Sequence, residues 1–200
     1  MTDSSRLLLG TKNKGKFLEM QEILEPLSFT LVSPLDLGIT QDAPEEAETF
    51  EENAIGKARF YRHLSALPTL ADDSGLFVDA LANELGVKTR RWGAGAEATD
   101  QEWLDHFLKR MKTEDNRKAR FVTVLAYIDD AEQEYLFTGV CNGSITQTQE
   151  MTTYPAGLPL LSCFKPDGYD NVLGLLSREE KDHINHRRIA LQQFVRSVTN

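Results

Sequence analysis

The chain has 200 residues, a length that suits one globular domain with its own core. Its 22 Lys and Arg are outnumbered by 31 Asp and Glu, and the net charge of −9 opposes binding to a nucleic acid polymer or an anionic membrane. No signal-peptide core begins the chain, and no apolar run reaches the roughly 18 residues of a membrane span. Cys141 and Cys163 can form one disulfide at most, so we expect a cytoplasmic protein in which both are packing residues.

The N-terminal segment predicts a strand, a helix and a second strand. Residues 7–9 are three leucines, typical of a short buried strand, and residues 10–16 form a polar loop bounded by glycines. Apolar side chains then recur at helical spacing and predict a helix that ends near Pro26. Residues 29–33 predict a second strand, and residues 34–47 an acidic loop.

The middle of the chain predicts a helix that leads into a strand. Thr49 and Glu52 form a capping pattern for a helix of about four turns, which Pro68 closes. Residues 69–71 predict a buried strand, and the sequence Asp-Asp-Ser-Gly follows directly over residues 72–75. We expect two carboxylates and a hydroxyl at the C-terminal end of this strand, where functional groups of α/β proteins often gather.

The second half predicts two more helices and a hairpin. Thr99 begins one helix, and Ser177 begins another that continues without a break almost to the end of the chain. Residues 120–128 and 134–140 are β-rich runs that predict an antiparallel hairpin. We therefore expect an α/β fold with a mixed sheet, formed by residues 1–200 as one domain.

The first candidate site is the loop from Gly10 to Lys16. Gly10, Gly15 and Lys16 have the spacing of a phosphate-binding loop between a strand and a helix. Phe17 stands where such loops place the Ser or Thr that holds magnesium, so this loop can bind phosphate but cannot form that metal site. The alternative is a solvated basic turn. The loop concentrates the positive charges of Lys12, Lys14 and Lys16.

The second candidate site is acidic. Asp72 and Asp73, with Glu45, Glu46 and Glu48 on the acidic loop, offer oxygen ligands for a hard cation such as Mg²⁺. A triphosphate requires such a cation, and Asp73 could orient or deprotonate a water molecule for attack on phosphorus. The alternative is an Asp-rich turn beside a solvated acidic face.

The third candidate site lies near the beginning of the C-terminal helix. His183 and His186 lie three residues apart, but no third ligand with recognisable spacing supports a zinc site. Recognition of phosphate or a base by Lys181, His186 and Arg187 is the preferred interpretation, and a solvated helix face is the alternative.

Five segments, in this order, resemble the inosine triphosphate pyrophosphatase family. Residues 11–16 (TKNKGK) resemble its Thr-Gly-Asn-x-x-Lys loop, and residues 45–54 (EEAETFEENA) its Glu-x-Gly-x-Thr-Phe-x-Glu-Asn-Ala segment. Residues 71–76 (ADDSGL) match residue for residue, and residues 86–92 (GVKTRRW) match more loosely. Residues 177–187 (SREEKDHINHR) are similar to Ser-x-Glu-Glu-Lys-x-x-Ile-Ser-His-Arg.

The resemblance implies an elongated mixed sheet with flanking helices, two lobes around a nucleotide cleft, and a homodimer. It also implies Mg²⁺-dependent hydrolysis of non-canonical purine nucleoside triphosphates to a monophosphate and pyrophosphate. By position, Asp73 is the implied base and metal ligand, Glu45 a second metal contact, and Lys16 a catalytic clamp on the phosphates. The other implied substrate contacts are Thr11, Lys12, Asn13, Lys14, Gly15, Ser74, Arg91, Lys181, His186 and Arg187.

One segment departs from the family pattern. Where the family has Gly-Phe-Gly-Tyr-Asp-Pro-x-Phe, residues 157–164 read GLPLLSCF. Leu158 replaces the aromatic residue that stacks on the purine, and Leu161 replaces the aspartate. We expect retained phosphate chemistry with a changed base preference. A catalytically weak paralogue that binds a nucleotide or a partner is the alternative, whereas Phe17 disfavours a P-loop phosphotransferase.

Overall fold

The computed structural model describes residues 6–199 except 83 and 96, with the side chains of 90 and 91 also left out, and contains one mixed sheet of order β2-β1-β3-β4-β5-β6. The strands are β1 (Arg6–Leu9), β2 (Thr30–Val32), β3 (Thr69–Val78), β4 (Lys118–Ile128), β5 (Glu134–Ile145) and β6 (Phe164–Pro166). The α-helices are α1 (Lys14–Leu24), α2 (Phe50–Ser65), α3 (Asp100–Met111), α4 (Arg178–Ile184) and α5 (His186–Thr199). Short 3-10 helices are η1 (Leu35–Leu37), η2 (Asp79–Leu81), η3 (Gly86–Arg91), η4 (Pro159–Ser162) and η5 (Leu173–Leu175).

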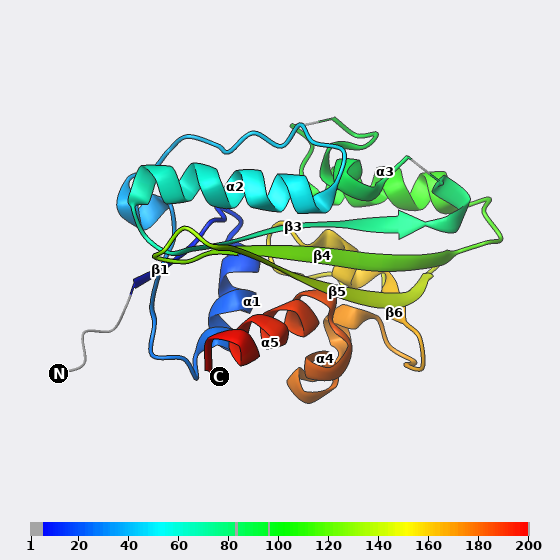
Figure 1. The fold of residues 1–200 in the computed structure, drawn as a ribbon. Helices are drawn as coiled ribbons and strands as arrows, with labels where there is room; N and C mark the ends of the chain where they lie inside the picture. Colours follow the sequence, from blue (N-terminus) through cyan, green and yellow to red (C-terminus); the bar gives the residue numbers. More distant parts are fainter. Residues whose placement is uncertain (1–5, 83, 96, 200) are drawn as a thin grey trace.

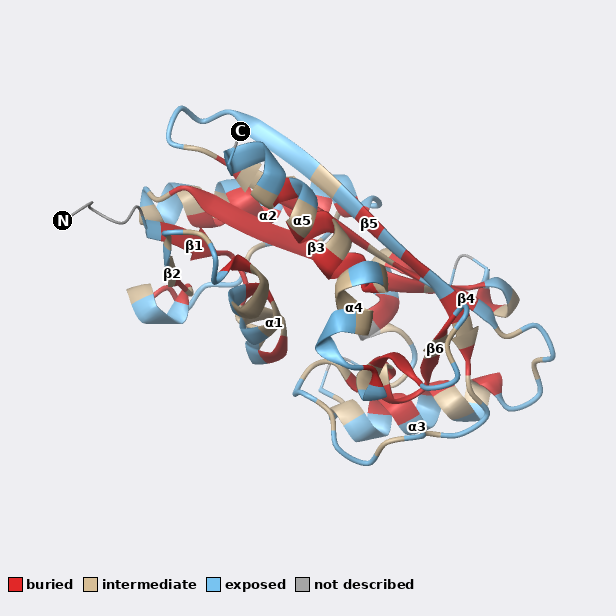
Figure 2. Ribbon diagram, turned by 90° about the horizontal axis from the view of Figure 1, so that it is seen from below, coloured by how far each residue is buried: buried red, intermediate tan, exposed pale blue. Residues whose placement is uncertain are grey.

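The molecule is elongated, with helix α2 on one face of the sheet and helices α1 and α5 on the other (Figure 1). The small residues Ala54 and Ala58 bring α2 close to β3 and β4, whereas Met20 and Phe194 pack α1 and α5 together. A second lobe holds α3, β6 and η4 around its own apolar cluster, and it lies at the far end from β1 and β2 (Figure 2). The expected two-lobed α/β architecture is confirmed.

Strand β3 is longer than predicted, and this corrects the expected place of Asp72 and Asp73. Its parallel pairing with β1 ends at Leu70, but its antiparallel pairing with β4 continues from Thr69 to Val78. The two aspartates therefore lie inside β3, beyond the end of β1, and not at a strand end. Because β1 has ended there, the loop that follows it opens beside this part of β3.

The predicted C-terminal helix is wrong as one element. Helix α4 ends at Ile184 and α5 begins at His186, with Asn185 in an extended conformation (φ −67°, ψ 124°) between them. The Asn185 side-chain oxygen accepts hydrogen bonds from the backbone N–H groups of Arg187 and Arg188. It thus caps a new helix, which turns the first residues of α5 toward β3.

The other local predictions are confirmed. The Thr99–Glu102 and Ser177–Glu180 capping boxes are formed, and Thr49 caps α2. The predicted hairpin is formed by β4 and β5. Cys141 and Cys163 are buried free thiols, and burial raises the pKa of each to about 12, so both are packing residues.

None of the helices in the described ranges combines the length and the apolar character needed to cross a membrane.

Candidate active site

A cavity of about 400 Å³ lies between the two lobes. Loop 10–13, strand β3 and helix α2 line one side, and helix α3 with residues 157–161 lines the other. The predicted site residues among its lining are Thr11, Lys12, Asn13, Lys16, Glu45, Asp73, Ser74, His186 and Arg187. Most of the predicted residues are therefore brought together in one place.

The loop after β1 is shaped by its own polar side chains. The Asn13 side chain accepts a hydrogen bond from the Lys16 backbone N–H at 3.0 Å and so caps α1. The Thr11 hydroxyl accepts one from the Asn13 N–H at 3.2 Å. A Cβ atom at Gly15 would lie 2.7 Å from the Ala156 carbonyl oxygen, so only glycine allows this approach of the two lobes. Phe17 packs against the apolar core of α1 and α5, away from any magnesium-binding role.

Two of the predicted contacts on this loop are not in the cavity lining. Lys14 is exposed at the beginning of α1, and Gly15 is buried beneath the loop. Lys12 does line the cavity, where its ammonium group donates to Asp42 at 2.8 Å. The positive charge of Lys12 and Lys16 thus faces the cavity, whereas that of Lys14 faces solvent.

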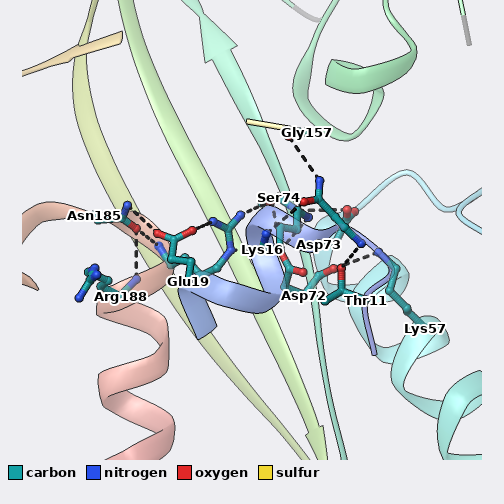
Figure 3. A network of polar contacts seen from close by, with 12 residues as sticks. Thr11, Lys16, Glu19, Lys57, Asp72, Asp73, Ser74, Gly157, Asn185 and Arg188 are labelled. Atoms are coloured by element: carbon teal, nitrogen blue, oxygen red, sulfur yellow. Dashed lines mark hydrogen bonds and ion pairs between the residues drawn. The ribbon is translucent and has the colours of Figure 1, made fainter. Parts of the chain in front are cut away.

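Asp72 and Asp73 have different partners because successive side chains of a strand point to opposite faces. Asp72 is buried and accepts from Lys16 at 2.8 Å and from Arg187 at 3.4 Å (Figure 3). Burial opposes its charge, but Lys16, Arg187 and Lys57 together outweigh that cost and hold the pKa of Asp72 well below its ordinary value. Asp72 is therefore a buried anion that positions two cations.

Asp73 is the less compensated carboxylate. Its side chain lines the cavity, only 7% of the residue is exposed, and one oxygen accepts from the Ser74 N–H at 3.1 Å. The other oxygen, Oδ2, is buried and has no hydrogen-bond partner among the described residues. Burial raises the pKa of Asp73 to about 6, against the opposing effect of Lys57 and Lys16. Such a carboxylate is a stronger base than an ordinary aspartate.

Lys57 is a site residue that the sequence analysis did not find. It extends from α2, donates to the Asp72 carbonyl oxygen at 3.0 Å, and forms an ion pair with Glu45. Burial opposes its charge, but the carboxylates of Asp72, Glu45 and Asp73 raise the pKa of Lys57, so it stays charged. The sequence did contain a signal for it, because Lys57 is a charged residue on the helix face where Ala54, Ala58 and Tyr61 of α2 are buried.

The residues present suit a magnesium ion. Asp73 Oδ2 is a buried carboxylate oxygen without a partner in the described structure, and Glu45 interacts electrostatically with the same carboxyl group. The described residues contain no group of three or more His, Cys, Asp or Glu suited to holding a metal. Mg²⁺ commonly uses one or two carboxylates and takes its other oxygens from phosphates and water. Glu46 and Glu48 are exposed and do not line the cavity.

Arg187 is held in a buried network that joins helix α5 to helix α1 and strand β3. It forms an ion pair with Glu19 of α1 and donates to Ser74 Oγ at 3.2 Å. Burial opposes the charge, but Glu19 and Asp72 raise the pKa of Arg187 above its ordinary value. Asn185 also donates to Glu19, at 2.9 Å, so the break between α4 and α5 supports this network.

Three other predicted residues have different outcomes. His186 lines the cavity and stacks on Phe121 with ring centroids 4.6 Å apart, and burial keeps the pKa of its imidazole well below its ordinary value. Lys181 lies outside the cavity lining and donates to the Gly174 carbonyl oxygen at 3.1 Å. The side chain of Arg91 lies outside the described part of the structure.

The segment that departs from the family pattern reaches the cavity. Its residues and two aromatic side chains form what we call the apolar end, which consists of Leu158, Pro159, Leu160, Leu161, Trp103 and Phe121. The charged end, by contrast, consists of Lys12, Lys16, Lys57, Asp73 and Arg187. One cavity thus combines a surface suited to phosphates with a surface suited to an apolar ring.

Solved proteins share this fold over nearly the whole chain. A HAM1 protein from Coxiella burnetii gives a TM-score of 0.81 at 31% identity, and the Ham1 protein of Staphylococcus aureus gives 0.80 at 26%. Each comparison covers 98% of both chains. The architecture therefore places this chain among proteins of the Ham1 fold.

The sequence comparisons are equally extensive. The Ham1 family model matches residues 7–197. The chain is 36% identical to a dITP/XTP pyrophosphatase of Flavobacterium johnsoniae, over 97% of this chain and 98% of the relative. It is 37% identical to a dITP/XTP pyrophosphatase of Escherichia coli, over 98% of each. The chain belongs to the Ham1 family, which confirms the resemblance found in its motifs.

Proposed function

We propose that the protein is a pyrophosphatase that hydrolyses non-canonical purine nucleoside triphosphates to a nucleoside monophosphate and pyrophosphate. The relatives named dITP/XTP pyrophosphatase support the substrate class. The observation that carries the proposal is the buried Oδ2 atom of Asp73, which has no partner among the described residues and belongs to a cavity otherwise rich in cations. A base with an available oxygen beside a polyanion-binding surface is what hydrolysis of a triphosphate requires.

The charged end binds the triphosphate in this proposal. Asp72 orients Lys16 and Arg187, and the N-terminus of α1 adds backbone N–H groups. Burial lowers the pKa of Lys16, and the ion pair with Asp72 opposes that effect. Because these groups are fixed before the substrate arrives, they stabilise the charge that develops on phosphate oxygens without rearranging. Lys12 supplies a further cation at the cavity wall.

Asp73 accepts the proton of the attacking water. The water oxygen forms a bond with the α phosphorus, the bond to the bridging oxygen breaks, and pyrophosphate departs with that electron pair. The proton moves to the carboxylate group of Asp73. With a pKa of about 6, Asp73 is mostly ionised at pH 7.5 and still basic enough to hold the proton.

Mg²⁺ is the proposed cofactor, held by Glu45 and Asp73. When bound, it would neutralise charge on the phosphate groups and complete its coordination with phosphate oxygens and water. Lys57 forms an ion pair with Glu45, and its charge also interacts with Asp73, so it offsets the repulsion between the two proposed metal ligands.

The test is pyrophosphate release from inosine, xanthosine and the common nucleoside triphosphates, with Mg²⁺. We expect inosine or xanthosine triphosphate to lead, and Asp73→Asn to lower kcat by about 1,000-fold, the range of a lost general base. Asp79→Asn, at an exposed aspartate that directly follows the same strand, is the matched control and keeps full activity. Undiminished turnover of triphosphates by the Asp73→Asn variant would refute the proposal.

The same assay separates the alternatives. No turnover of any triphosphate favours a nucleotide-binding or regulatory paralogue, and nucleoside diphosphate as product indicates a phosphotransferase. A cytoplasmic homodimer completes the proposal, as the family resemblance implies. Sedimentation velocity of the purified protein should give twice the monomer mass.

A further inference from the structure

Trp103 is an unexplained feature of the apolar end. It lines the cavity, and only 2% of its surface is exposed. Its indole N–H is buried and has no hydrogen-bond partner among the described residues. An indole nitrogen donates and cannot accept, and an unmade bond at a buried donor is costly. The Trp103 N–H therefore needs a hydrogen-bond acceptor that the described part of the protein does not supply.

The other tryptophan provides an internal comparison. Trp92 packs edge-on against Trp103 with ring centroids 6.5 Å apart, but its indole N–H donates to Glu84 at 3.2 Å. Trp92 does not line the cavity. Of the two tryptophans of the chain, Trp103 lines the cavity, and its N–H is the one that has no partner among the residues that the structure describes.

The orientation of Trp103 is fixed by its neighbours. Its ring stacks on Phe107 at 5.3 Å with an interplanar angle of 13°. Thr99 closes the capping box of α3, and the Asp100 carboxylate accepts from the Gly157 N–H at 2.6 Å. This last bond ties the first turn of α3 to the segment that carries Leu158. The indole is therefore a rigid part of the cavity wall.

Among the described residues of the apolar end, none has a side-chain group that could accept from this N–H. Leu158, Leu160 and Leu161 are hydrocarbon, and Phe121 is aromatic. The Thr89 hydroxyl, which also lines the cavity, is already bonded to the backbone of Gly86 and Leu76. A polar atom that enters this end with a ligand would be the natural partner of Trp103.

We propose that the Trp103 indole N–H donates to a carbonyl oxygen of the nucleobase and so selects bases that carry one. An amino group at the same position, as in adenine, is itself a hydrogen-bond donor and could not accept from the indole N–H. The proposal rests on the proposed function, because it takes the triphosphate to lie at the charged end. It names a specificity-determining residue that compensates for the apolar side chains of residues 158–161.

The kinetic test compares inosine triphosphate with purine riboside triphosphate, which lacks the carbonyl oxygen. Wild-type protein should prefer inosine triphosphate by about tenfold in kcat/KM, and Trp103→Phe should abolish that preference by weakening inosine triphosphate alone. Trp92→Phe is the matched control and keeps the preference. If Trp103→Phe weakens both substrates equally, or neither, the contact does not exist.

A binding test does not depend on turnover. Trp92→Phe leaves Trp103 as the single tryptophan, so its fluorescence can be followed during titration with inosine monophosphate and with purine riboside monophosphate. We expect the Trp92→Phe variant to bind inosine monophosphate about tenfold more tightly than purine riboside monophosphate. The Trp103→Phe single variant, measured by calorimetry, should bind the two monophosphates equally. Equal binding in both variants would refute the role of Trp103.

The two readouts also separate the two proposals. Selective binding of inosine monophosphate without hydrolysis of any triphosphate would leave the role of Trp103 intact and overturn the proposed activity. Hydrolysis without a loss of preference in Trp103→Phe would do the reverse. Circular dichroism and the melting temperature of each variant verify that it is folded.

Discussion

The charged end and the apolar end of the cavity are built on different principles. At the charged end, buried carboxylates hold cations in place through ion pairs. Asp72, for example, pairs with Lys16 and Arg187. At the apolar end, the lining is hydrocarbon and aromatic, and the Trp103 indole N–H has no partner in the described part of the chain. The proposed phosphate chemistry and the proposed base selection therefore fall on separate elements, β1–α1 with β3 on one side and α3 with η4 on the other. Changes at one end should leave the other end working.

The largest expected effect that tests this separation is at Lys16. Lys16→Met removes a phosphate contact and leaves Asp72 with less compensation in a buried place, so kcat/KM should fall about 100-fold. The free energy of unfolding should also fall, by about 3 kcal/mol, which chemical denaturation measures. Lys14→Met on the same loop is exposed and should change neither. Similar results for the two variants would contradict the role given to the charged end.

A smaller effect is expected at the apolar end. Leu158→Phe supplies a ring on which a purine can stack, so KM for inosine triphosphate should fall about fivefold while kcat stays the same. Inhibition by tripolyphosphate, which has no base, should be unchanged. Leu175→Phe, at an exposed leucine of η5, is the control. A change in tripolyphosphate inhibition would mean that the two ends are not independent.

The stability of the metal-free protein gives a third test. The folded pKa of Asp73, about 6, lies above its ordinary value of 3.8, so the folded state binds the proton more tightly. Its contribution to stability is present below about pH 4 and is lost as the pH rises through 6. Asp73→Asn should therefore raise the melting temperature by a few degrees at pH 7.5 and not at pH 4. A pH-independent difference between variant and wild type would contradict the burial cost assigned to this carboxylate.

The smallest expected effect concerns the break between α4 and α5. Asn185→Ala removes the cap of α5 and a bond to Glu19, which should lower stability by about 1 kcal/mol and the melting temperature by about 3 °C. Asn116→Ala, at an exposed position with one local bond, should have less effect. Calorimetry distinguishes the two, and an equal shift would show that the Asn185 cap has no special role.

Local signals in the sequence predicted much of the fold. Thr99 and Ser177 were found because a cap and its partner lie within one turn of each other. The full length of β3 could not be found in this way, since its second half is defined by pairing with β4, about fifty residues further along the chain. The apolar pattern of α5 hid the break at Asn185, because that residue caps the next helix without interrupting the helical spacing.

The candidate site shows the same division. Most of its residues lie in short motifs, and the motifs predicted Asp73, Lys16 and Arg187. Lys57 and Trp103 were missed because their significance depends on contacts, or the lack of them, with residues distant in sequence. The apolar character of residues 158–161 was evident in the sequence, but its place opposite Trp103 was not.

The central claim is that water attacks the α phosphorus with Asp73 as the base. Hydrolysis of inosine triphosphate in ¹⁸O-water, followed by mass spectrometry of both products, tests it most directly. The account predicts that the label enters inosine monophosphate, that unlabelled pyrophosphate is released, and that Asp73→Asn forms neither product at an appreciable rate. Label in pyrophosphate, or release of inosine diphosphate, would contradict it.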